Sequence, residues 1–172
     1  MDTRQDKKQQ FVADPKKGRS KLLVTTVVVA GLLAAVGLFV VGGGAGTADA
    51  FVTAQNGQVS LPLADVQDGK AHYYAYRAAD GNVSKFFLLK SHDGAIRAAF
   101  DACDVCYKSL KGYRQEGDSM VCNNCNQQFS SDRINEVKGG CNPAPLTRTI
   151  SGDQVVLIES ELQAGVRYFP RA

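Results

Sequence analysis

Histidine is scarce in this 172-residue sequence, which contains only His72 and His92. His72 lies in a tyrosine-rich segment, where a histidine is more often packed or at the surface than bound to a metal. His92 precedes Asp93 and Gly94 in a turn and is expected to be solvated. Because neither histidine has an evident nucleophile as its partner, the sequence lacks the residue set of a hydrolase. The composition therefore does not favour an enzyme.

An excess of positive charge is also missing from most of the chain. The formal net charge of +3 comes from residues 1–21, which contain seven Lys and Arg residues against three Asp. Residues 22–172 carry 13 basic and 14 acidic side chains. A nearly neutral domain offers no electrostatic footprint for phosphate backbones. We therefore expect no nucleic-acid partner.

One long apolar run, residues 22–41, contains no charged side chain. As a helix it would rise roughly 30 Å, the thickness of the hydrocarbon core of a bilayer. The basic residues before it keep the N-terminus in the cytoplasm by the positive-inside rule. The competing interpretation is a signal peptide cleaved after Ala50, since residues 48–50 read Ala-Asp-Ala. The apolar run is longer than the usual signal-peptide core, which favours an uncleaved anchor.

Four regions follow from this pattern. Residues 1–21 are predicted to form a basic cytoplasmic tail, 22–41 a transmembrane anchor, 42–50 a flexible Gly- and Ala-rich tether, and 51–172 an extracytoplasmic cysteine-rich domain. The protein is thus expected in the cytoplasmic (inner) membrane as a single-pass protein, with its N-terminus inside and its C-terminal domain outside. The membrane is its first expected partner.

The predicted domain is mainly β, a small α+β fold with antiparallel strands. A meander is expected from four segments rich in alternating apolar or aromatic residues, with turns at Gly- and Asn-containing positions between them. These segments are residues 58–63, 71–77, 83–90 and 95–102. Two hairpins are also expected, one formed by residues 113–116 and 119–121, and one near the end of the chain formed by 148–150 and 154–159.

The five cysteines are the most informative feature of the domain. Cys103 and Cys106 form one Cys-x2-Cys pair, Cys122 and Cys125 form a second, and 15 residues separate the pairs. At this spacing four thiolates can bind one tetrahedral metal ion, because each pair directs two sulfurs at one point. The pattern specifies the ligands better than the ion, since zinc, a single iron and an iron-sulfur cluster all accept thiolates. Cys141 follows after another 15 residues and could be a fifth ligand, a resolving thiol or a free thiol.

Two other interpretations of the cysteines remain open. Structural zinc commonly uses this spacing. Outside the cytoplasm, a Cys-x2-Cys pair without metal readily becomes a disulfide. The residues that follow the pairs also differ: Asn126 can adopt the left-handed conformation that turns backbone N–H groups toward sulfur, whereas Tyr107 fits it poorly. One of the two pairs is therefore expected to be irregular.

Several motifs resemble the FtrD-like membrane iron-sulfur protein family. They occur in order at residues 100–106 (FDACDVC), 112–117 (GYRQEG), 122–125 (CNNC) and 139–146 (GGCNPAPL). The likeness extends upstream to 69–74 and 86–87, so it covers roughly residues 58–170. The resemblance implies that Cys103, Cys106, Cys122, Cys125 and, less strongly, Cys141 are ligands of an iron-sulfur cluster or mononuclear iron, with zinc as the alternative.

The resemblance also implies an accessory role in iron transport, by electron transfer or metal handling. With one expected membrane span, any iron permease would be a separate polypeptide, and a separate redox partner is expected as well. The sequence lacks the closely spaced cysteine run of bacterial ferredoxins. Two other functions stay open: an interaction module with structural zinc, and a membrane-tethered thiol-disulfide oxidoreductase.

Overall fold

The computed structural model describes residues 49–170. The chain divides into two compact units, Met1–Ala45 and Gly46–Ala172, and the described residues belong to the second. The predicted tail (1–21), anchor (22–41) and nearly all of the tether lie outside the described residues. Within residues 49–170, no helix has the length and apolar character needed to cross a membrane.

A four-stranded sheet forms the centre of the domain, in the order β1-β3-β4-β5. Its strands are β1 (Ala50–Val52), β3 (His72–Arg77), β4 (Val83–Lys90) and β5 (Ile96–Phe100). The predicted antiparallel meander is confirmed for β3, β4 and β5. The prediction of antiparallel pairing alone was wrong in one place, because β1 pairs with β3 in parallel. This strand also begins at Ala50, the last residue of the predicted tether.

The second sheet has three strands, in the order β2-β10-β9. These are β2 (Gln58–Pro62), β9 (Arg148–Ser151) and β10 (Gln154–Ile158). The hairpin predicted near the end of the chain is confirmed as β9 and β10. The prediction that residues 58–63 join the meander was wrong: β2 pairs with β10 instead. A 3-10 turn, Leu63–Val66, redirects the chain after β2, so that β2 and β3 enter different sheets.

The third sheet has the order β6-β7-β8. The predicted hairpin is confirmed as β6 (Tyr113–Glu116) and β7 (Ser119–Cys122). Its third strand, β8 (Gln128–Ser130), was not predicted. The strand has three residues, of which only Phe129 is large and apolar, so it carries almost no periodic signal.

One α-helix, α2 (Glu159–Gly165), follows β10 and was not predicted either. Glu159 and Glu161 lie in its first turn, where carboxylates interact favourably with the helix dipole. Gly165 ends the helix against the ring of Phe100, and a β-carbon at this position would collide with that ring. The 3-10 turn Val166–Tyr168 continues from the helix and buries Tyr168 near Phe100, with ring centroids 5.7 Å apart.

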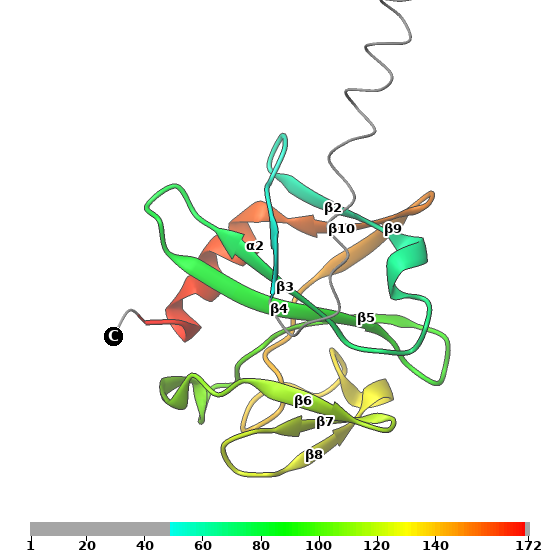
Figure 1. Ribbon diagram of the computed structural model, residues 1–172, viewed down its shortest axis with the longest axis vertical. Helices are drawn as coiled ribbons and strands as arrows, with labels where there is room; N and C mark the ends of the chain where they lie inside the picture. The colour runs from blue at the N-terminus through cyan, green and yellow to red at the C-terminus, as the bar shows by residue number, and fades with distance from the viewer. Residues whose placement is uncertain (1–48, 171–172) are drawn as a thin grey trace, which may run out of the picture. The chain divides into compact units, whose positions relative to one another are not determined.

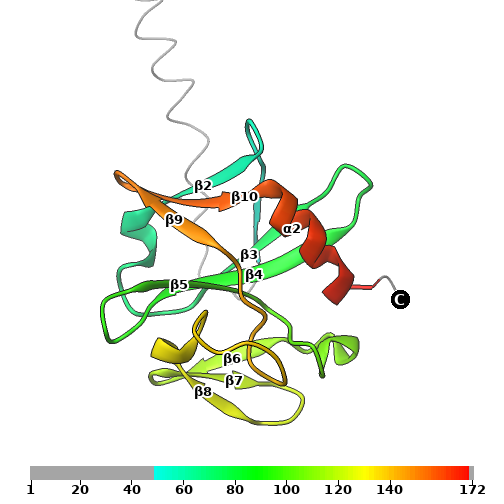
Figure 2. The same ribbon diagram turned by 180° about the vertical axis from the view of Figure 1, so that it is seen from behind.

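The three sheets form three layers, with the central sheet between the other two (Figures 1 and 2). Strand β4 explains this arrangement, because Phe86, Phe87, Leu88 and Leu89 are all almost completely buried. Alternate side chains of a strand point to opposite faces. Accordingly, Phe86 and Leu88 enter one core with β2, β10 and α2, whereas Phe87 and Leu89 enter a second core with β6 and β7.

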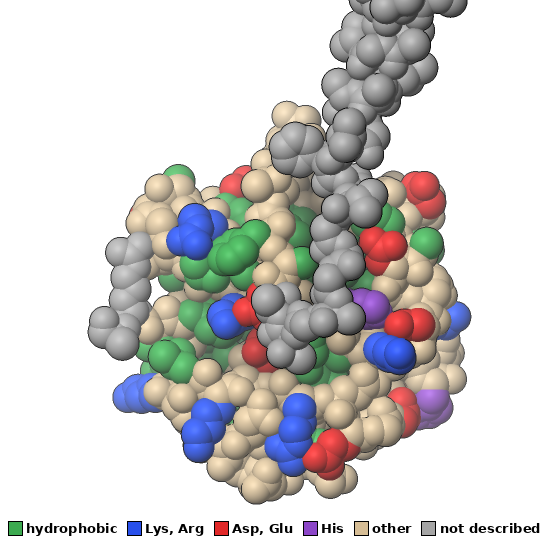
Figure 3. All heavy atoms as spheres, viewed as in Figure 1, with side chains coloured by type: hydrophobic (Ala, Val, Ile, Leu, Met, Phe, Trp, Pro, Cys, Tyr) green, Lys and Arg blue, Asp and Glu red, His purple; other side chains and the backbone are tan. Residues whose placement is uncertain are grey.

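Charged side chains of both signs are interspersed on the face of the domain shown in Figure 3. Among the described residues, several charges on the surface are paired, for example Lys85 with Asp49 at 2.7 Å and Arg114 with Glu116 at 2.7 Å. This mixture agrees with the nearly neutral composition of residues 22–172.

Candidate metal centre

The loop after β5 carries the first two cysteines, and Asp101 shapes it. The carboxylate of Asp101 accepts a hydrogen bond from the backbone N–H of Tyr113 at 2.7 Å, so the two ends of the loop are joined. Gly112 has a φ of +63°, and a β-carbon there would collide with the Asp101 carboxylate. Burial raises the pKa of Asp101 to about 7, against the opposing effect of the Tyr113 N–H. Asp101 lies in the FDACDVC motif, but nothing in the sequence marks it as a site residue.

The first cysteine pair is irregular, as the sequence predicted. The backbone N–H of Cys106 donates to the sulfur of Cys103 at 3.1 Å. Tyr107 does not take the left-handed conformation but begins a short 3-10 turn, Tyr107–Ser109. The left-handed residue comes later, at Leu110, with a φ of 55°. The bulk of Tyr107 thus moves the reversal of the chain three residues further along.

The second pair forms a tighter turn at the end of β7. Asn126 has a φ of 59°, in agreement with the prediction. Its N–H donates to the carbonyl of Cys122 at 2.8 Å. Asn123 fastens this turn to the first loop, since its N–H donates to the Gly112 carbonyl at 3.0 Å and its side chain to the Lys111 carbonyl at 2.8 Å. These bonds hold the two cysteine pairs beside one another.

Cys141 reaches the site because the segments on either side of it are attached to β5. Ala144 donates to the carbonyl of Ala102 at 2.9 Å and accepts from the N–H of Phe100 at 2.8 Å. The side chain of Asn135 bonds to both the N–H and the carbonyl of Ala98, at 2.9 and 2.6 Å. The hydroxyl of Tyr113 donates to the Cys141 carbonyl at 2.5 Å. Nothing in the sequence marks Asn135 or Tyr113 as a site residue, although Tyr113 lies in the GYRQEG motif, because their role depends on partners distant along the chain.

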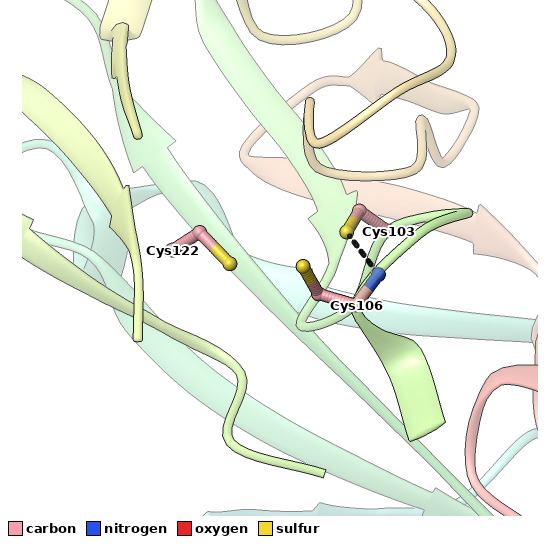
Figure 4. A group of neighbouring side chains, drawn as sticks. All are labelled: Cys103, Cys106 and Cys122. Atoms are coloured by element: carbon pink, nitrogen blue, oxygen red, sulfur yellow. Dashed lines mark hydrogen bonds between the residues drawn. The ribbon is translucent and has the colours of Figure 1, made fainter. Parts of the chain in front are cut away.

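The five sulfurs divide into two groups of three. Within each group, every sulfur lies within 4.8 Å of the other two. One group contains Cys103, Cys106 and Cys122, whose side chains converge in Figure 4, and the other contains Cys106, Cys125 and Cys141. Cys106 belongs to both, and its sulfur lies 3.8 Å from that of Cys141. The structure therefore brings all five predicted residues together, in a grouping that the pair spacing did not anticipate.

The cluster extends from the core to the surface. Cys103 and Cys122 are buried, 1% and 2% exposed, whereas Cys106 and Cys141 are half-buried and Cys125 is exposed. Burial raises the pKa of the Cys122 thiol to about 11, and burial together with the neighbouring thiols raises that of Cys141 to about 12. The backbone N–H of Gln127 lowers the pKa of Cys125. The thiolate form is thus most accessible at Cys125, the exposed member of the cluster.

The donor set fits a thiophilic metal. A tetrahedral site with metal–sulfur bonds of about 2.3 Å has sulfur–sulfur edges of about 3.8 Å. The Cys106–Cys141 separation matches this edge. Polar groups that donate to sulfur include the N–H of Cys106, to Cys103, and the side-chain amide of Asn124, to Cys106 at 3.4 Å. Such hydrogen bonds favour the thiolate over the thiol.

The two histidines stand apart from the sulfurs and bind carboxylates. His72 Nε2 lies 2.8 Å from Asp68, and His92 Nδ1 lies 2.6 Å from Asp118. Within residues 49–170, the groups of side chains arranged to hold a metal contain cysteine alone. The expectation that His92 is solvated is confirmed, with 57% of its side chain exposed.

Three comparisons place the chain among known proteins. No curated protein matches it. Among solved structures, the quaternary ammonium Rieske monooxygenase CntA, crystallised with an inhibitor, aligns with a TM-score of 0.38 and 12% identity over 57% of this chain. The chain spans only 29% of that structure. A family model described as "Membrane iron-sulfur containing protein FtrD-like" matches residues 66–169, which include all five cysteines. The chain therefore belongs to the FtrD-like family of membrane iron-sulfur proteins.

Proposed function

We propose that this protein is a membrane-anchored, extracytoplasmic iron-sulfur or iron-binding protein that handles electrons or metal for an iron transport system. The observation that supports this best is the convergence of five cysteine sulfurs into one cluster that reaches the surface. Membership of a family described as membrane iron-sulfur proteins favours iron as the metal. The iron permease and the redox partner are separate polypeptides in this proposal.

The residues around the sulfurs suit an electron-transfer site. A bound iron centre would supply one-electron chemistry, and its reduction potential depends on hydrogen bonds to sulfur and on exposure. Cys103 and Cys122 lie in the same core as Phe87 and Met120, which exclude water from the inner side. The donors at Cys106 N–H and the Asn124 amide stabilise negative charge on sulfur. Exposed Cys125 provides a side from which a partner can approach closely.

Metal analysis with an absorption spectrum tests this proposal. Protein purified without oxygen is expected to contain iron and to absorb visible light, since iron thiolates are coloured. A full complement of zinc in a colourless protein would contradict the proposal and favour a structural role. Structural zinc is the second candidate because Cys103 and Cys122 are themselves members of a hydrophobic core, where a metal would stabilise packing.

Thiol counting tests the oxidoreductase alternative. The sulfurs of Cys106 and Cys141 are close enough for a disulfide to form with a small movement. If the protein is an oxidoreductase, its thiols should react with the alkylating reagent in the absence of metal and should reoxidise reversibly to a disulfide. If the proposal holds, alkylation of the thiols requires a chelator, because metal protects them.

The proposed orientation has its own test. Protease added to cells with a permeable outer layer is expected to digest the domain after residue 50 and to spare residues 1–21. Protection of the domain until the inner membrane is lysed would contradict an extracytoplasmic location. Compartment matters to the chemistry, since unmetallated cysteines outside the cytoplasm oxidise readily.

A further inference from the structure

The grouping of the cysteines departs from what one tetrahedral ion requires. In a four-thiolate site, all six sulfur–sulfur edges are about 3.8 Å when the bonds are about 2.3 Å. The described cysteines instead form two groups of three within 4.8 Å, with no group of four. Cys103 and Cys122 belong to one group only, and Cys125 and Cys141 to the other only. Cys106 alone is common to both.

We infer that the cluster contains two metal positions bridged by the thiolate of Cys106. The inner position is formed by Cys103, Cys106 and Cys122, and the outer position by Cys106, Cys125 and Cys141. A thiolate sulfur has enough lone pairs to bind two metal ions at once. This inference rests on the proposed function only in assuming that these thiolates bind a thiophilic divalent cation such as Fe²⁺.

Charge balance supports two ions over one. Four thiolates around a single divalent cation leave two uncompensated negative charges, part of them beside the buried sulfurs of Cys103 and Cys122, with the fifth cysteine a neutral thiol. Two divalent cations bound by all five thiolates leave only one. Two cationic side chains follow the first cysteine pair along the chain, Lys111 and Arg114. Arg114 pairs with Glu116 and donates to Asn123, and Lys111 is exposed to solvent. The second cation supplies the missing positive charge.

The two positions differ in access to solvent. The inner one has two buried ligands, 1% and 2% exposed, and the outer one has exposed Cys125 and half-buried Cys141. Metal exchange is therefore expected to be fast at the outer position and slow at the inner one. This order also suits loading from the surface, with Cys106 held in place by the Asn124 amide.

Titration with Co²⁺ tests the bridge, because Co²⁺ bound to thiolates in tetrahedral geometry absorbs strongly. Full-length protein, reduced and free of metal, is titrated without oxygen. The wild type is expected to bind about two Co²⁺ ions per chain. Cys103→Ser or Cys122→Ser should remove the inner ion, and Cys125→Ser or Cys141→Ser the outer one. Cys106→Ser should weaken both, by about tenfold or more.

A magnetic measurement distinguishes a bridge from two independent sites. The electron paramagnetic resonance signal of Co²⁺ should grow with the first equivalent and fall with the second, since ions joined by one sulfur couple. Val105→Ser is the matched control: it places a serine between the first two cysteines, on a side chain that is 63% exposed, and removes no thiol. It should retain both ions and the coupling. A thermal transition measured for every variant checks folding.

The outcomes separate this inference from the proposed function. A wild type that binds one ion, together with Cys141→Ser that binds it equally well, would overturn the two-position inference and leave the proposed function intact. Two uncoupled ions, or two ions retained in Cys106→Ser, would overturn the bridge. No binding of Co²⁺ or Fe²⁺ by the reduced wild type would overturn both.

Discussion

The two cores on either side of the central sheet differ in size and in chemistry. The core shared with β2, β10 and α2 contains 17 buried apolar residues, whereas the core shared with β6 and β7 contains 8, two of which are cysteines. The first can be stabilised by burial of hydrocarbon alone. The second lies under strands of three or four residues, and sheets this small are only marginally stable by themselves.

The two cores therefore differ in what stabilises them. The larger core contains no cysteine, so we expect it to hold the central sheet in place with or without metal. The smaller core includes Cys103 and Cys122, so a metal bound by these cysteines would add its binding energy directly to folding. The cysteine cluster thus lies beside the smaller core, which we expect to open locally more readily than the larger one.

The largest effect is expected from a cavity in the larger core. Phe86 is completely buried and stacks on Tyr74, with ring centroids 5.4 Å apart. Phe86→Ala should lower the free energy of unfolding by about 3–5 kcal/mol, with and without metal. Chemical denaturation measures this loss. The control Phe51→Ala, at a side chain that is 62% exposed, should cost about 0.5 kcal/mol. Equal losses in the two variants would contradict the assignment of the core.

Removal of metal should affect mainly the smaller core. After chelation under reducing conditions, the amides of β6, β7 and β8 are expected to lose protection from hydrogen exchange. The amides of β3, β4 and β10 should keep theirs, because their core contains no cysteine. Exchange measured by mass spectrometry resolves these segments. Uniform loss of protection across all three sheets would mean that the cores do not differ in their dependence on metal.

Arg97, on β5, bonds to Ile134 and Glu136 beside the smaller core. Its replacement should have an intermediate effect on stability. The side chain is 6% exposed, pairs with Asp93 and Glu136 at 2.5 Å, and donates to the Ile134 carbonyl at 3.3 Å. Arg97→Met should cost about 2 kcal/mol, since charged hydrogen bonds are lost while both carboxylates are already solvated. It should also speed alkylation of Cys141, because the segment before this cysteine loosens. The exposed control Arg77→Met should change neither quantity.

The smallest effect is expected from the titration of Asp93. The Ser91 hydroxyl, the Ala95 N–H and then Arg97 lower the pKa of this carboxyl from 3.8 to about 2. A lowered pKa in the folded state adds stability that is present above the unfolded value and is lost as the pH falls through the folded value. The melting temperature of Asp93→Asn should thus fall below that of the wild type at pH 7 and approach it near pH 2. A constant difference across this range would contradict the lowered pKa of Asp93.

Much of the fold was readable from local patterns. The strands β3, β4 and β5 and both predicted hairpins follow from apolar periodicity and from Gly- or Asn-containing turns. The left-handed Asn126 and the irregular first cysteine pair follow from steric preference at single residues. The pairing of β2 with β10 could not be read this way, because the periodicity of a strand does not specify its neighbour. Strand β8 and helix α2 were too short to leave a periodic signal.

The sequence by itself determined the chemistry of the candidate ligands: five thiols, four of them in two pairs at a spacing that suits a metal, and no competing histidine set. These are properties of residue type and short-range geometry, which require no knowledge of the fold. The tertiary structure alone decided that Cys141 joins the cluster and that Cys106 lies between two groups. The physical reason is that Cys141 is positioned by bonds from Ala144 and Asn135 to β5, partners more than 35 residues away along the chain.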